Sequence, residues 1–176
     1  MSHNILTLKS VDNKNNALLR YAWSASALDN GWVGNLQSQS SVTGYKEVWD
    51  FTQPTTGSLL GLWIAAEPEV VITDSKYGNI NPDVRDFEIS ASKVFTARKL
   101  VPGDIIEITA DGLNDATVQA FANAAATNYE FTWADAPAGT AAMSLRYIST
   151  EYVPVASGSA MGDSRIPSYK FEVLYN

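Results

Sequence analysis

Glu67 and Glu69 are the side chains whose type and spacing come closest to a catalytic pair, because they flank Pro68. Side chains two residues apart on an extended chain point the same way and lie about 7 Å apart. Glycosidases use two carboxyl groups about 5 to 9.5 Å apart across a bound sugar. Nothing else in the sequence supports such a site. We therefore interpret the pair as an exposed strand edge that carries charge.

Other chemistry has less support. The chain has no cysteine and a single histidine, His3, near its first residue. The segments 81–86 and 111–115 gather side-chain oxygens, but they lack the spacing of a calcium loop and are typical of turns. No nucleophile elbow and no phosphate-binding glycine loop occurs. The sequence predicts no enzyme, no metal site and no cofactor.

Composition restricts the possible partners. The 176 residues carry a formal net charge of −7, and 45% are hydrophobic. This length and composition are typical of one folded domain. An acidic chain gains nothing from binding phosphate backbones. No stretch reaches the roughly 18 apolar residues of a membrane span, and the first residues do not form a secretory signal. We expect a single domain that binds neither nucleic acid nor membranes.

The elements that would position any site are mostly strands. Short runs rich in Val, Ile, Thr and aromatic residues alternate with proline and turn residues, which predicts an all-β domain, a β-sandwich or jelly roll. The predicted strands lie near residues 4–8, 17–23, 44–51, 59–66, 69–73, 85–90, 93–99, 104–110, 128–134, 142–150 and 168–175. Residues 169–173 alternate apolar and polar side chains, which predicts one buried face. The continuous run after a turn at Gly103 predicts a strand covered on both faces. One short helix is expected near 115–125, where apolar residues recur at helical spacing.

A specific register is predicted for one hairpin. Residues 128–134 and 142–148 each alternate apolar and polar side chains. Pairing Phe131 with Leu145 places all the apolar side chains on one face, and a one-residue slip would break this match.

Two segments, 27–43 and 154–167, show neither the alternation of a strand nor the spacing of a helix. Both are rich in small and polar residues. We expect them to be long loops, which are uncommon in compact domains unless they have a function. Trp32, Asp163 and Arg165 lie in these segments and are the candidate partner-binding residues, because Trp and Arg are enriched at interface hot spots. The alternative for Trp32 is that it folds back onto the core.

A family resemblance rests on five segments, residues 62–70, 81–87, 94–97, 103–108 and 169–173. Together they resemble the decoration, or cement, proteins of tailed-bacteriophage heads. The resemblance implies a structural virion protein, made in the host cytoplasm, that binds the outer surface of the capsid. Its partners would be the major capsid protein and further copies of itself, as a dimer or trimer. No functional residue carries over, because that family has no fixed site to match.

A second function class stays open. The chain has five Trp and eight Tyr, and lectin-like β-sandwiches stack sugars on such rings. Most of these aromatics lie in predicted strands, where we expect them in the core. The number of aromatic residues nevertheless keeps a carbohydrate-binding module, a lectin-like β-sandwich, as the alternative function.

Overall fold

The computed structural model describes residues 5–10, 16–40, 46–52, 61–67, 71–74, 79–81, 87–109, 144–155 and 164–176. In these residues the chain is all-β, as predicted, with one turn of 3-10 helix. The elements in chain order are β1 (Leu6–Ser10), η1 (Asn16–Leu18), β2 (Leu19–Trp23), β3 (Val33–Gln39), β4 (Val48–Thr52), β5 (Trp63–Ala65), β6 (Val71–Asp74), β7 (Asn79–Asn81), β8 (Val94–Lys99), β9 (Ile105–Thr109), β10 (Ser144–Val155) and β11 (Ser164–Tyr175).

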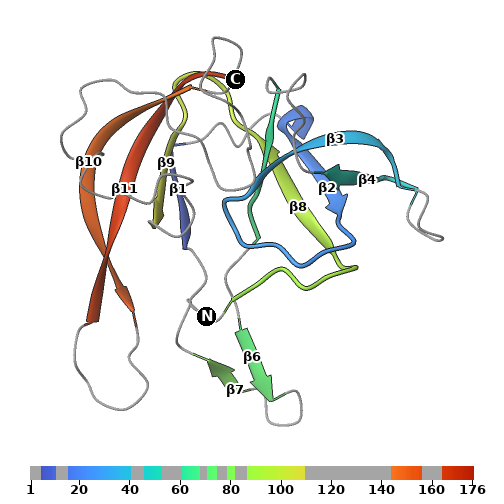
Figure 1. The fold of residues 1–176 in the computed structure, drawn as a ribbon, viewed down its shortest axis with the longest axis horizontal. Coiled ribbons are helices and arrows are strands. Elements are labelled where there is room, and N and C mark those ends of the chain that lie inside the picture. Colours follow the sequence, from blue (N-terminus) through green and yellow to red (C-terminus); the bar gives the residue numbers. More distant parts are fainter. Residues whose placement is uncertain are drawn as a thin grey trace.

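Five strands close into a barrel in the order β2-β4-β3-β5-β8 (Figure 1). Neighbouring strands are antiparallel, except that β2 and β4 run parallel. Inside the barrel, the rings of Phe51 and Phe95 meet edge to face with centroids 5.3 Å apart. Ala22, Ala65 and Ala97 are fully buried in the same cluster. Their small side chains leave room for two rings in a narrow barrel.

Four further strands form an antiparallel sheet, β1-β9-β11-β10, which packs against the outside of the barrel. Ile106 on β9 and Phe171 on β11 lie in one buried cluster with Val33 and Ile64 from the barrel wall. The described residues therefore form two cores, one inside the barrel and one between the barrel and the sheet. Strands β6 and β7 pair with each other apart from both (Figure 1).

Burial confirms the alternation predicted for residues 169–173. Tyr169, Phe171 and Val173 are buried, whereas Lys170 and Glu172 between them are partly exposed. The run that follows Gly103 is confirmed as a strand covered on both faces, since four consecutive residues, 106–109, are buried.

Strands β10 and β11 form a twisted ribbon that extends past the rest of their sheet (Figure 1). The two strands pair along their full length, from Ser144 opposite Tyr175 to Val155 opposite Ser164. Strand β9 pairs only with residues 168–172 of β11. Among the described residues, no third strand pairs with the last part of the ribbon, residues 152–155 and 164–167. We call this part the ribbon tip.

The prediction of two long loops is wrong in part. The segment 27–43 contains β3, and the segment 154–167 contains the ends of β10 and β11. Residues 33–39 read VGNLQSQ, a composition of low β-propensity, yet they pair with β4 and β5 inside the closed barrel. Backbone pairing in the tertiary structure outweighs propensity here.

Two other predictions lie outside the described residues. They are the helix near 115–125 and the strand 128–134, together with its predicted pairing of Phe131 with Leu145. Within the predicted strand 85–90, residues 87–90 are described, and only Ile89 pairs there, in an isolated bridge to Leu28.

Candidate functional site

The structure separates the predicted partner-binding residues. The half-buried side chain of Trp32 packs against the cluster inside the barrel, and its carbonyl accepts a 2.9 Å hydrogen bond from the Ala65 N–H. Trp32 therefore covers the core, which was the alternative to a partner anchor. Arg165 is exposed and stands on β11 opposite Pro154, in the ribbon tip and not in a loop. Asp163 lies outside the described residues.

Glu67 has a structural role that its sequence context did not indicate. Its N–H donates to Asn30 Oδ1 at 2.9 Å, and its carbonyl accepts from Asn30 Nδ2 at 2.8 Å. Its carboxylate accepts a hydrogen bond from the N–H of Thr96 on β8. The expectation of an exposed strand edge is wrong for Glu67, which is half-buried and joins three segments of the barrel. Glu69 lies outside the described residues.

The ribbon tip is the first candidate binding surface. Tyr152 opposes Pro167 and Pro154 opposes Arg165, so alternation places these four side chains on one face. All four are exposed, and Tyr152 is 63% exposed. The next residue on this face of β11, Tyr169, is fully buried against the barrel. The apolar face of the sheet thus continues into solvent beyond the barrel.

Exposed apolar side chains concentrate on these two strands. Among the described residues, five large hydrophobic side chains are exposed, and four of them belong to β10 or β11: Ile148, Tyr152, Leu174 and Tyr175. Leu174 and Tyr175 lie at the opposite end of the ribbon from the tip. Apolar residues gathered on an open surface are typical of protein interaction sites.

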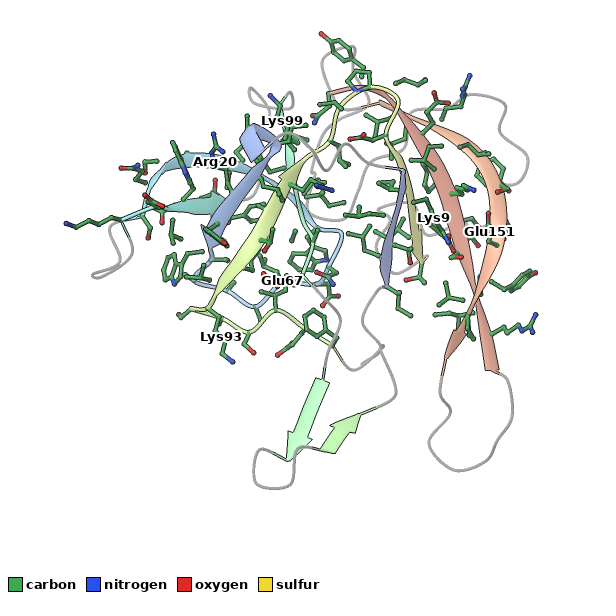
Figure 2. The ribbon with its side chains drawn as sticks, turned by 180° about the vertical axis from the view of Figure 1, so that it is seen from behind. Lys9, Arg20, Glu67, Lys93, Lys99 and Glu151 are labelled. Atoms are coloured by element: carbon green, nitrogen blue, oxygen red, sulfur yellow. The ribbon has the colours of Figure 1, made fainter. Side chains whose placement is uncertain are left out.

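A groove of about 740 Å³ on the barrel is the second candidate surface. Its lining comes from β2, β3, β4 with the residue before it, and β8. It consists of Leu19, Arg20, Tyr21, Gln39, Glu47, Trp49 and Thr96. Figure 2 shows Arg20 and Lys99 toward one end of the barrel, and Glu67 and Lys93 toward the other. The groove combines two aromatic rings with one cation, one carboxylate and one amide, a mixture that suits a polar organic ligand.

Arg20 is held within the groove wall by contacts to its own barrel. Its Nη1 donates to the carbonyl of Leu19 at 2.8 Å. Its guanidinium carbon lies 5.9 Å from the centre of the Trp63 ring on β5, a distance at which a cation and a ring attract each other.

Sequence reasoning missed both surfaces. The predicted strand 142–150 stopped short of Tyr152, although the β-forming residues of 151–155 (EYVPV) were a signal that the strand continued. The groove had no local signal, because its residues come from segments up to 77 positions apart, Leu19 and Thr96.

Metal and membrane features are absent from the described part of the chain. No three His, Cys, Asp or Glu side chains there gather closely enough to hold a metal ion. No helix in those same residues is long and apolar enough to cross a membrane. The chain matches no protein-family model, no curated protein and no solved structure. Similarity to known proteins therefore assigns no role to the ribbon tip or to the groove.

Proposed function

We propose that this protein is a structural protein of a bacteriophage virion, which binds the outer surface of the capsid and ties neighbouring subunits of the major capsid protein together. The resemblance to decoration proteins suggests the assembly. The observation that carries the proposal is the ribbon tip, which presents an exposed apolar face beyond the body of the protein.

The tip suits a protein partner in both composition and placement. Tyr152 and Arg165 lie on its exposed face, and Tyr and Arg are enriched among the residues that contribute most to binding. The ribbon is part of a packed four-stranded sheet at its other end, so the tip is presented on a rigid element. A rigid presenting element lowers the entropy lost on binding.

The two prolines of the tip define how it binds. Pro154 and Pro167 have no N–H group, so neither strand can offer an uninterrupted row of donors to a further strand. Binding therefore uses the side chains of the ribbon face and not addition of a strand. The capsid groove that receives it would be an apolar cleft between subunits.

Self-association as a dimer or trimer belongs to the same proposal. Leu174 and Tyr175 are 42% and 52% exposed at the far end of the sheet. A contact between copies at this end would leave each ribbon tip open for the capsid.

Co-sedimentation with purified capsids of the phage that carries the gene tests the proposal. The wild-type chain should sediment with the capsids, at a copy number commensurate with the major capsid protein by mass spectrometry of the particles. Tyr152→Ser should weaken binding by tenfold or more. Tyr21→Ser is the matched control, because Tyr21 is equally exposed, at 61%, but lies on the barrel.

Two outcomes would contradict the proposal. One is the absence of this chain from purified particles. The other is unchanged capsid binding by the folded Tyr152→Ser variant.

A further inference from the structure

We infer that the groove on the barrel is a binding site for a neutral oligosaccharide, a function separate from capsid attachment. The groove has a volume of about 740 Å³. Sites for small organic ligands span about 300 to 1,000 Å³, so this volume accommodates a few linked sugar rings.

The aromatic side chains supply the apolar part of the site. Trp49 is half-buried in the groove wall, and Tyr21, which also lines the groove, is 61% exposed. A pyranose ring has one face made of C–H bonds, and this face packs on the electron-rich face of an aromatic ring. A half-buried Trp with an exposed Tyr is an arrangement for stacking, since both rings keep surface that a ligand can cover.

Polar groups stand beside these rings at positions fixed by strand pairing. Gln39 on β3 is the direct cross-strand partner of Trp49 on β4, and Thr96 on β8 is the partner of Tyr21 on β2. Directly opposed residues on antiparallel strands have Cβ atoms about 4.5 to 5.5 Å apart. Each aromatic residue thus has a hydrogen-bonding side chain within reach of the hydroxyl groups of a stacked sugar.

Charge in the groove favours a neutral ligand. Arg20 and Glu47 both line it, and their opposite charges balance. A carboxylate accepts hydrogen bonds from two neighbouring hydroxyl groups, and the balanced charges give no net attraction for the carboxylate or phosphate of an acidic sugar. The contacts of Arg20 with Leu19 and Trp63 hold its charge in the groove wall. The chemistry of the lining therefore fits hydroxyl-rich, uncharged saccharides.

A glycan microarray that includes both neutral and acidic oligosaccharides, followed by calorimetric titration with the bound glycans, tests the inference. We expect at least one neutral glycan to bind. Glu47→Gln removes the charged acceptor and keeps the size of the side chain, and should weaken binding by about tenfold. Trp49→Ala should weaken it by at least as much.

The exposed Tyr21→Ser variant keeps the test valid if Trp49→Ala does not fold, because Tyr21 contributes to the same wall and adds little to the core. Tyr152→Ser is the control that should leave glycan binding unchanged while it weakens capsid binding. The two proposals therefore fail separately. Absence of binding to every glycan, binding of acidic glycans alone, or unchanged affinity in folded Glu47→Gln and Tyr21→Ser would overturn the inference.

Discussion

At the scale of single residues, the side chain of Asn30 bonds to the main chain of Glu67 as a neighbouring strand would. It is 1% exposed, and its amide exchanges two hydrogen bonds with the main chain of Glu67. Asn30→Ala should lower the free energy of unfolding by about 1–3 kcal/mol, because it leaves buried backbone groups without these partners. Urea denaturation measures the loss. The exposed Gln37→Ala on β3 is the control, and an equal effect of both variants would contradict this role for Asn30.

Gly34 is required by the ring of Phe51. A Cβ atom added at Gly34 would lie 2.6 Å from two atoms of that ring and 2.7 Å from the carbonyl oxygen of Thr52. Gly34→Ala should therefore destabilise the protein by about 1–3 kcal/mol through overpacking. Combining it with Phe51→Leu tests the cause, since the double variant should lose less stability than the sum of the single variants. Additive losses would show that the clash with the Phe51 ring is not the reason.

At the level of elements, a buried charge cluster joins three strands of the sheet. Glu107 on β9 is 3% exposed. It accepts a hydrogen bond from Ser168 on β11 and forms a 2.8 Å ion pair with Lys9 on β1. The hydrogen bond to Glu107 raises the pKa of Lys9 above its usual 10.5, aided by the charges of Glu107 and Glu151 and opposed by burial.

This cluster predicts a pH-dependent contribution to stability. A raised pKa in the folded state means that the contribution of Lys9 is complete below pH 10.5 and is lost as the pH rises through the folded-state pKa. Lys9→Met should lower stability near neutral pH by about 1–3 kcal/mol, because it leaves the buried Glu107 short of a partner. The difference in the free energy of unfolding between wild type and variant, measured by urea denaturation, should narrow above pH 10.5. A gap that is constant through this range would contradict the pairing.

Strand positions were largely predictable from the sequence because their signals are local. The alternation at 169–173 specified which face of β11 is buried. The turn at Gly103 was also predictable, because glycine adopts a φ of +93° without strain. The strand after this turn was predicted to within about one residue at each end. Strand β3 was missed because its residues gain strand geometry only from neighbours far along the chain.

The candidate surfaces were less predictable than the strands. Trp32 was selected for its residue type within a polar segment, but the closing of the barrel directs its side chain to the core. Arg165 was placed in a loop, whereas pairing with β10 makes it part of a ribbon face. The lining of the groove depends on which strands become neighbours in the barrel, and strand order leaves no periodic pattern in a single sequence.

At the scale of the whole molecule, the two proposed binding surfaces belong to different bodies. The ribbon tip extends from the four-stranded sheet, and the groove lies on the barrel. Figure 1 shows the β10–β11 ribbon and the barrel on opposite sides of the molecule. One surface can therefore be occupied while the other stays open. A virion protein with this arrangement could hold the capsid with one side and meet surface glycans with the other.

Separate use of the two surfaces requires that the sheet and the barrel keep a fixed position relative to each other. Asn176 contributes to this fixed position. Asn176 follows β11 of the sheet, and its side chain binds the barrel-proximal backbone at two places. Its Oδ1 accepts from the N–H of Leu62 at 2.9 Å, and its Nδ2 donates to the carbonyls of Leu62 at 3.0 Å and Leu100 at 2.8 Å. One side chain thus joins the end of the sheet to the segments that flank β5 and β8.

Asn176→Ala should weaken the contact between the sheet and the barrel more than it weakens the sheet or the barrel itself. We expect the free energy of unfolding to fall by about 1–3 kcal/mol, with faster hydrogen exchange at the Leu62 N–H than at the amides of β9. Asn176→Asp is the matched variant: it keeps the oxygen that accepts from Leu62 but loses the amide that donates to both carbonyls, so its exchange rate should be intermediate. Protection of Leu62 that is unchanged in both variants would show that the shared apolar core alone, from Val33 and Ile64 to Phe171, fixes the sheet on the barrel.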